Sequence, residues 1–562
     1  MGLWRHISEE KGKYTALLVF SLIIFFLVVY PFGKLVVRSF FTQEGMGPTL
    51  ANYWELLTEP ELYSSLVNSF KLGFGITFMT LLLGVPMAWG VARTNMPLKG
   101  LVRTATVLTF ASPSFLAALA WMLLLGPRGG KLNLFLQDLL GLSSTPFNIF
   151  SVWGIIFVFS LFSYPLVYFV VSSALDNMDA SLEETAQILG ASKLRTLFTI
   201  TLPLVTPAIL AGAVLVFIEG LVIFDVPAVL GTPVGFFTLS TRMYAMFDYP
   251  PRFEMAAALA VPMIVVLVVM LLFQRLYLGR RQYSVLTGKT GKPQLVDLGP
   301  WRWVLAGYCL LIIFASVGVP FLTLIYTSLV KAFGLPLAGG NFAGLDNYIA
   351  LAGRPTVPRA IMDSALLAVL GTVSALSLAV GGSWVVERTK IKGRELISFL
   401  MMSAFAFPGV ALGVGLVLAY AGKPFYLYGT LWIFLLAYTV RGLPMGFMFS
   451  RSALKQISPD LEDAARTLGA SWGRTMLDVT VPLLRNSLFG VGVILFVFMF
   501  RELGTSVFLN TAGNEVISVV IYELYEEIRF PTMSALSVFV LLINISVVML
   551  ARRLIGDNPM RM

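Results

Sequence analysis

Apolar segments of bilayer length constrain this chain more than any other feature of its sequence. A helix needs about 20 apolar residues to cross the hydrocarbon core of a membrane, and the sequence offers twelve such segments. Only 12% of the residues are charged, which is about half the share found in soluble domains. We therefore expect an all-α polytopic membrane protein with about twelve transmembrane helices. The expected spans are 14–37, 67–92, 103–126, 150–174, 204–230, 254–278, 303–329, 362–386, 396–421, 428–450, 483–509 and 532–552.

The basic residues are distributed as a membrane topology requires. The net charge is +10, and most of the 40 Lys and Arg residues are in the amino terminus, every second loop and the carboxyl tail. The positive-inside rule then places both termini in the cytoplasm. This distribution explains the basic charge without a nucleic-acid partner. The first apolar segment lacks a small-residue cleavage site, so we expect a retained helix and not a signal peptide.

The chain has few residues of the types that form catalytic or metal sites. It has one cysteine, Cys309, and one histidine, His6, too few for a disulfide framework or a Cys/His metal centre. The string Gly288-Lys289-Thr290 looks like the end of a nucleotide-binding P-loop, but Tyr283 occupies the position where the first glycine is needed. We therefore expect no catalytic residue and no metal site, and we expect ATP hydrolysis to come from another polypeptide.

The sequence contains an internal duplication. Residues 181–203 and 460–482 align without a gap at an offset of 279 residues. The motif Trp89–Thr94 recurs at Trp384–Thr389 at an offset of 295, so the loop 127–149 is longer in the first half by the difference. We predict a first half at 1–278, a linker at 279–302 and a second half at 303–562. Six spans in each half give both halves the same orientation, related by an axis along the membrane normal. Paired prolines, Pro113 with Pro408 and Pro165 with Pro444, are expected to kink equivalent helices.

Each copy of the duplicated segment reads as one short helix. A capping box is expected at its start and a left-handed glycine at its end. The apolar positions between them fall on one face. Such a helix is about 12 Å long and too short to be stable alone, so a partner must hold it. The cap and stop residues are Ser181, Glu184 and Gly190 in the first copy and Asp460, Asp463 and Gly469 in the second, and the apolar faces are Leu182, Ala186, Leu189 and Leu461, Ala465, Leu468.

These segments resemble the EAA motif of bacterial ABC importer permeases. Glu184, Ala186, Gly190 and the closing Ile200-x-Leu202-Pro203 match it position by position, and Asp463 replaces the glutamate in the second copy. The resemblance implies the type I permease fold in a bacterial cytoplasmic (inner) membrane. It also implies that each segment is a cytoplasmic coupling helix. The implied ATPase-coupling residues are Glu183, Glu184, Ala186 and Gly190, and Glu462, Asp463, Ala465 and Gly469.

The same resemblance names the partners to expect. In this family a permease works with two copies of a cytoplasmic ATPase, which bind ATP and Mg, and with a substrate-binding protein outside the cytoplasm. We expect no cofactor on this chain. Segments such as Phe224–Gly231 and Arg501–Leu509 resemble the fused permeases of the ferric-iron group. Permeases for thiamine, polyamines, phosphonates and phosphosugars are similar too.

Four charged residues stand out, two in the fifth expected span and two in the eleventh. Each costs about 2.5–3.5 kcal/mol at the centre of a bilayer, so each should face the bundle interior or water. One interpretation is that they line the translocation path or its gate. The other is an ion pair between helices, such as Arg501 with Glu219 or Glu502, and the sequence does not separate the two. Arg441 is expected to snorkel to the interface. The four residues are Glu219, Asp225, Arg501 and Glu502.

Two other classes of protein compete with an importer permease. An ion-coupled secondary transporter would need no ATPase, and it typically has inverted repeats and helices broken in the middle of the membrane. The sequence indicates parallel repeats and continuous spans. A membrane enzyme would need a catalytic constellation, and the single histidine argues against one.

Overall fold

The computed structural model describes residues 14–15, 17–42, 47–179, 181–274, 276, 295–335 and 340–555. Within these ranges the secondary structure is helical, and β-type pairing is limited to two isolated bridges. Ten of the described helices are long and apolar enough to cross a membrane, and α5 with α6 forms an eleventh span that is sharply bent. The twelfth expected span, 396–421, is built from two shorter helices. The prediction of an all-α membrane protein is confirmed.

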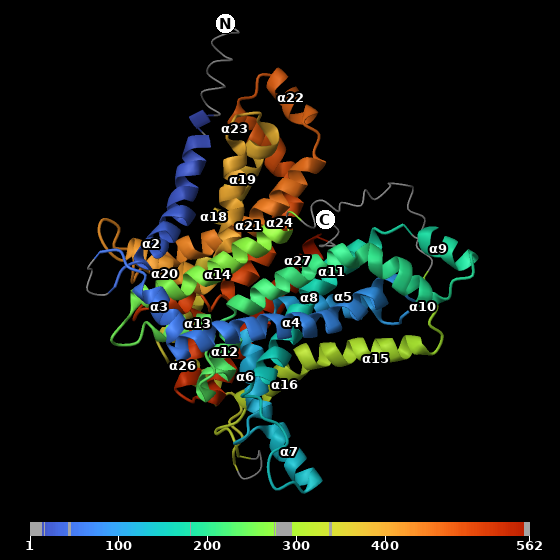
Figure 1. Ribbon diagram of the computed structural model, residues 1–562, viewed down its shortest axis with the longest axis vertical. Coiled ribbons are helices and arrows are strands. Elements are labelled where there is room, and N and C mark those ends of the chain that lie inside the picture. Colours follow the sequence, from blue (N-terminus) through green and yellow to red (C-terminus); the bar gives the residue numbers. More distant parts are fainter. Residues whose placement is uncertain are drawn as a thin grey trace.

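The helices follow one another in the order that the apolar segments predict (Figure 1). In the first half they are α2 (Tyr30–Arg38), α3 (Ala51–Thr58), α4 (Pro60–Arg93), α5 (Lys99–Ala111), α6 (Ser114–Leu125), α7 (Lys131–Leu140), α8 (Val152–Asp176), α9 (Ser181–Ile188), α10 (Lys193–Thr196), α11 (Leu202–Val222), α12 (Asp225–Leu230), α13 (Leu239–Ala245) and α14 (Phe253–Phe273). In the second half they are α15 (Trp301–Ile313), α16 (Val319–Ser328), α17 (Asp346–Ala352), α18 (Thr356–Arg388), α19 (Arg394–Ser403), α20 (Gly409–Tyr420), α21 (Leu431–Gln456), α22 (Asp460–Thr467), α23 (Trp472–Thr475), α24 (Val481–Phe500), α25 (Ser506–Leu509), α26 (Ile517–Glu526) and α27 (Phe530–Ile555).

Four expected spans are broken, which the sequence analysis did not foresee. The span 103–126 turns by 96° between α5 and α6. Proline explains the turn, because it lacks an N–H and pushes the preceding residue into extended backbone, here Ser112. Phe407 is extended ahead of Pro408 in the same way. The spans 204–230 and 483–509 end early, at Val222 and Phe500, before a short second helix. Pro113 and Pro408 therefore break their helices where a kink was expected, whereas Pro165 and Pro444 lie inside the continuous helices α8 and α21.

Four π-helical turns repeat the duplication at the level of the backbone. Two of them, η1 (Phe25–Val29) and η6 (Phe314–Gly318), directly precede α2 and α16. The other two, η2 (Leu197–Thr201) and η8 (Met476–Thr480), directly precede α11 and α24. Each following helix has a proline in its first turn. Because proline cannot donate to the preceding turn, a wider turn at that point is a known adjustment.

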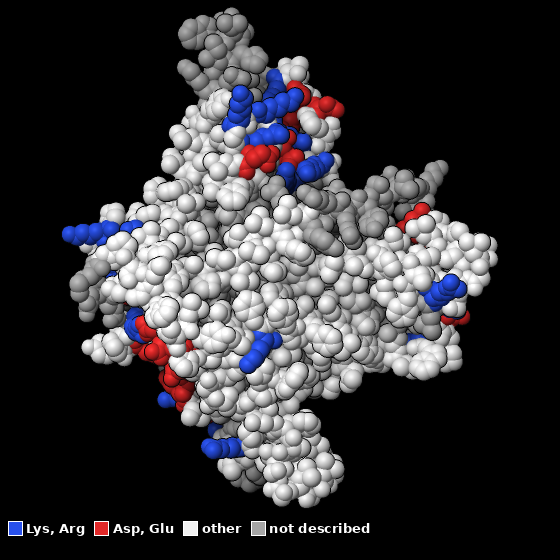
Figure 2. All heavy atoms as spheres, in the orientation of Figure 1, with Lys and Arg blue, Asp and Glu red and all other residues white. Residues whose placement is uncertain are grey.

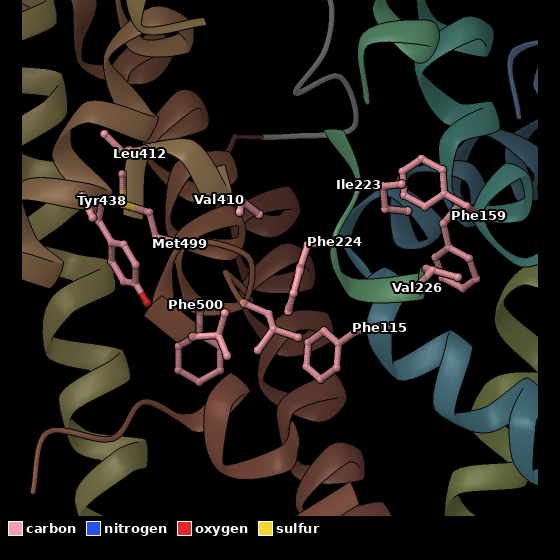
Figure 3. Packing of buried hydrophobic residues seen from close by; sticks show 14 of the residues in the cluster. Phe115, Phe159, Ile223, Phe224, Val226, Val410, Leu412, Tyr438, Met499 and Phe500 are labelled. Atoms are coloured by element: carbon pink, nitrogen blue, oxygen red, sulfur yellow. The ribbon is translucent and has the colours of Figure 1, made fainter. Parts of the chain in front are cut away.

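The two halves interlock. Helix α2 packs along α20 of the second half, and α16 packs along α6 of the first half as well as along α27. One buried apolar core continues across the boundary (Figure 3), where Phe115 and Phe224 belong to the same cluster as Val410 and Phe500. The predicted linker, 279–302, falls mostly outside the described residues, so the proposed boundaries between the halves stay a prediction.

Candidate coupling helices and translocation path

Helices α9 and α22 lie at separate extremities of the molecule, at the right edge and at the top of Figure 1. Each begins at the residue expected as its cap, so that residue is the first of the helix, and Pro459 before α22 forms no side-chain cap bond. The Ser181 amide donates to the Asp179 carboxylate at 2.9 Å, and the Asp460 amide donates to the Ser458 hydroxyl at 3.3 Å. Asp179 and Ser458 are equivalent positions of the repeat. The predicted capping box is therefore wrong for α22. The Glu184 side chain, its expected member in α9, lies outside the described residues.

The predicted glycine stops are confirmed. Gly190 and Gly469 have φ angles of +88° and +92°, in the left-handed region that glycine adopts without strain. The amides that follow them donate back to the carbonyls of Ala186 and Ala465, at 2.9 and 3.0 Å, which closes the helix end. A Cβ atom at either glycine would meet open space. Backbone conformation, and not crowding within this chain, therefore requires glycine here.

The ends of both helices present apolar side chains to the outside. Leu189 and Leu468, the residues before the glycines, are 82% and 89% exposed. Ile188 is also exposed, as are Leu182 and Leu461, the second residue of each helix. Soluble surfaces rarely leave apolar groups clustered in this way, and such clusters mark interaction sites. Each helix thus carries an apolar surface that the described part of the chain leaves exposed.

The glutamates Glu183 and Glu462 point inward. The Glu462 carboxylate accepts hydrogen bonds from Trp384, Arg388 and Thr480, at 3.1, 3.2 and 3.2 Å. The equivalent Glu183 accepts from Thr201, and its partner Arg93 lies 3.8 Å away. Both glutamates are buried. They therefore hold α9 and α22 to the ends of α4 and α18.

Sequence reasoning missed the residues that hold these glutamates, although the signal was present. Arg93 and Arg388 belong to one repeated motif, and Thr201 and Thr480 belong to the other. Arg388 also donates to the carbonyls of Leu454 and Ile457. A buried carboxylate needs a counter-charge, and both motifs supply the complementary groups at the ends of neighbouring spans.

Of the four charged residues in expected spans, Glu502 forms an ion pair, but with Arg441. The distance between the two side chains is 3.2 Å, and Glu502 also accepts from the amide and hydroxyl of Thr505. The expectation that Arg441 snorkels to the interface is therefore wrong. Glu502 is 7% exposed. A buried carboxylate of this kind ties the end of α24 to α21 in the middle of the second half.

Arg501 and Asp225 lie at helix breaks. Arg501 is the residue after α24 and donates to the carbonyls of Phe110 and Ser112, at 2.9 and 2.5 Å. These carbonyls end α5, where the helix dipole is negative and favours a cation. Asp225 begins α12 and accepts from the Ser114 hydroxyl at the start of α6, where the dipole favours an anion. The two charges therefore bracket the break between α5 and α6.

Glu219 stands apart from the other three. It lies in α11 and is exposed, although it is close to the end of a membrane span. The charged groups that act on it are Arg501, Arg441 and Asp225. The ion pairs found in the described part of the chain do not include it. Glu219 is thus an accessible carboxylate beside the inter-half contacts of Arg501.

An aromatic cluster joins the two halves near these breaks. Phe224 and Tyr244 of the first half pack on Phe508 of the second, with ring centres 6.2 and 5.7 Å apart. Tyr522 adds a contact of 6.3 Å to each of the first two rings. The Tyr525 hydroxyl donates to the carbonyl of Val229 at 3.0 Å. The halves therefore meet closely here, while α9 and α22 are apart at the other end of the molecule (Figure 1).

Comparisons with known proteins bear on this arrangement. The family described as "Binding-protein-dependent transport system inner membrane component" matches residues 80–282 and 379–556. The "Ferric transport system permease protein FbpB" of Actinobacillus pleuropneumoniae is 25% identical over 98% of this chain and 80% of its own length. A "Putative ferric transport system permease protein FbpB 1" of Haemophilus influenzae is 26% identical over 91% and 80%.

Shorter relatives match one half of the chain. The "Molybdenum transport system permease protein ModB" of Escherichia coli is 30% identical over 39% of this chain and 93% of its own length. Among solved structures, a chain from "a bacterial ABC transporter involved in the import of the acidic polysaccharide alginate" is 22% identical. It covers 50% of this chain and 100% of its own, with a TM-score of 0.40.

Proposed function

Because this chain belongs to the family of binding-protein-dependent transport system inner membrane components, we propose that it is the fused permease of an ABC importer for ferric iron. The transmembrane permease of such an importer forms the translocation path, and both of its permease domains are present here in one chain. The observation that carries the proposal is the duplicated pair of helices α9 and α22, each ending in a left-handed glycine and an uncovered apolar tip.

The substrate follows from the extent of similarity. The ferric permeases match nearly the whole chain, including the fusion of two domains, whereas the molybdenum permease matches 39% of it. The accessible carboxylate of Glu219 suits a cation. Thiamine, polyamines, phosphonates and phosphosugars remain the alternatives, and polyamine transport has a half-length relative in the "Spermidine/putrescine transport system permease protein PotB" of Haemophilus influenzae.

Two cytoplasmic ATPase subunits would seat on α9 and α22. Their apolar tips offer Leu189 and Leu468, which are almost fully exposed. The anchors of Glu183 and Glu462 would carry a movement of each tip to the ends of α4 and α18. ATP and Mg would be bound by the ATPase and not by this chain. A substrate-binding protein would deliver the substrate at the opposite end.

The proposed orientation places α9, α22 and both termini in the cytoplasm of a bacterium, with the chain in its inner membrane. Charge supports it: charged side chains gather over α19, α22 and α23 and beside α3, and the middle of the face between them is nearly uncharged (Figure 2). Such a band is what the hydrocarbon core requires. The aromatic cluster of Phe224, Tyr244, Phe508 and Tyr522 would then close the outer end of the path.

An ion-coupled secondary transporter is the rival. The broken spans remove one argument against it, since broken helices are typical of such carriers. The parallel orientation of the two repeats still argues against it. The two classes differ in one requirement: an importer takes up substrate only with ATP and its ATPase, whereas a carrier needs an ion gradient alone.

The test is reconstitution of the chain in vesicles with an ABC ATPase and a ferric-binding protein from the same genome. We expect uptake of radioactive ferric iron that requires ATP, and uptake driven by an ion gradient without ATPase would overturn the proposal. The variant Gly190→Asp with Gly469→Asp should lose ATPase association. Gly235→Asp is the matched control, because Gly235 also has a positive φ and open space around it but lies near α12.

A further inference from the structure

Helix α7 is an amphipathic helix with an uncovered apolar face. It lies in the loop 127–149, which is longer than its counterpart in the second half, and it protrudes at the bottom of Figure 1. Phe135, Leu139 and Leu140 are 60%, 65% and 61% exposed. At 100° per residue, Leu132 and Leu136 fall among them on the same side. We call these five residues the α7 apolar face. In Figure 2 this end of the molecule is mostly uncharged.

The helix is held firmly by one buried side chain. The Asn133 amide donates to the carbonyls of Leu125 and Phe147, at 2.8 and 2.7 Å, and accepts from the Phe147 amide at 3.1 Å. Asn133 is completely buried. Its bond to Leu125 ties α7 to the last residue of α6. The α7 apolar face is therefore presented at a set position next to the end of a membrane helix.

The surface next to α7 is apolar and belongs to helices long enough to span a membrane. Lys131, the first residue of α7, lies over the ring of Tyr326 in α16 at 5.9 Å. On α16, which ends a membrane span, Leu322 and Ile325 are exposed. Trp153, the second residue of α8, is 77% exposed. Exposed Trp side chains mark the level of the lipid headgroups. The apolar surface of the spans thus continues onto α7.

We propose that the α7 apolar face lies in the interfacial layer of the lipid bilayer, on the side of the membrane away from α9 and α22. Amphipathic helices bind there by placing Phe and Leu side chains between headgroups and acyl chains. A protein that docks only during transport would leave this face in water between cycles, which is unfavourable for so many apolar side chains. The bilayer next to α16 covers it at all times. The inference does not depend on the substrate or on the ATPase.

Site-directed spin labelling tests the proposal in the full-length chain. Cys309 is the single cysteine and is buried, so Cys309→Ala provides a background for one introduced cysteine at a time. Nitroxides at Leu139→Cys and Leu140→Cys would report on the apolar face. Asp138→Cys, an exposed neighbour off this face, is the matched control. The variants would be reconstituted in vesicles of phosphatidylethanolamine and phosphatidylglycerol.

We expect labels at 139 and 140 to collide several-fold more often with oxygen than with a water-soluble nickel chelate, and the label at 138 to show the reverse. Equal, water-like accessibility at all three positions would overturn the proposal. So would spin–spin broadening, which would assign the face to a second copy of the chain. Protection that arises only when a ferric-binding protein is added would likewise overturn it, in favour of a protein partner.

Discussion

The hydroxyl of Tyr308 donates a hydrogen bond of 2.8 Å to the backbone carbonyl of Leu82, across the boundary between the two halves. Leu82 precedes Pro86 by four residues inside α4, and the proline nitrogen has no hydrogen to donate to that carbonyl. The hydroxyl of Tyr420 donates in the same way to Phe26, whose partner in a π-helical turn would be the nitrogen of Pro31. Tyrosines thus satisfy carbonyls that prolines leave free, and they do so at inter-half contacts.

Replacement of this tyrosine by phenylalanine should weaken the contact between the halves. Tyr308→Phe keeps the ring but leaves the Leu82 carbonyl without its donor, which should cost about 1 kcal/mol of stability. Tyr63→Phe, at a half-exposed tyrosine on the same α4, should change nothing. The measurement is the thermal unfolding midpoint in detergent. Equal midpoints for Tyr308→Phe and wild type would show that water or lipid replaces the bond without loss.

The two coupling helices should respond differently to loss of their buried charge. Glu462→Gln disturbs three close hydrogen bonds and leaves Arg388 without its carboxylate, so we expect a loss of about 2 kcal/mol. Glu183→Gln should cost less, because Arg93 is already 3.8 Å away. Glu395→Gln, at an exposed carboxylate on α19 that is not among the implied coupling residues, is the control for charge alone. Thermal unfolding and the stimulation of ATPase activity would both be measured. A larger effect of Glu183→Gln would contradict this ranking.

The pair of Arg441 and Glu502 should behave as a coupled unit. Arg441→Met leaves a buried carboxylate without its counter-charge, which costs about 3 kcal/mol. Adding Glu502→Gln removes that charge, so the double variant should be more stable than Arg441→Met alone. A double-mutant cycle on thermal unfolding checks this. Additive losses of stability would show that the two side chains act independently. Both would then have to be counted among the residues that line the translocation path.

The spans and the duplication could be predicted because both are properties of local sequence. Twelve apolar runs led to the helices, and the left-handed glycines followed from their position after an apolar turn. The capping error arose because Ser181 and Asp460 are cap-type residues that happen to be the first residues inside the helix. Asp179 and Ser458, two positions earlier, are residues of the same cap-forming types and accept from the first amide of each helix. Residue type alone therefore does not locate the start of the helix.

The helix breaks could not be predicted because their partners are distant in the sequence. Pro113 makes a kink probable in any helix, but a turn of 96° leaves the carbonyls of Phe110 and Ser112 unpaired. Arg501, almost 400 residues away, satisfies them. One of the two sequence interpretations paired Arg501 with an acid because opposite charges in neighbouring spans attract. The structure favours the helix terminus, since its dipole and free carbonyls supply the same compensation.

Glu219 is the residue that best separates the path interpretation from the ion-pair interpretation. Asp225 and Glu502 each have a hydrogen-bonding partner that accounts for their burial. Glu219 is exposed. The cationic side chains that interact electrostatically with it are Arg501 and Arg441. If it faces the path, its charge lowers the energy of a passing cation, because Coulomb interactions are strong away from bulk water. Its removal should therefore change transport and leave stability unchanged.

The prediction is that Glu219→Gln lowers the rate of ferric-iron uptake about tenfold, which corresponds to about 1.4 kcal/mol in the barrier. Its thermal unfolding midpoint should match that of the wild type, because a path-facing carboxylate supports no neighbouring helix. Glu61→Gln is the control, since Glu61 is an exposed acid on α4 that pairs with Arg242. Uptake would be measured in reconstituted vesicles with ATPase and binding protein. Normal uptake together with a lowered midpoint would assign Glu219 to structure and remove it from the path.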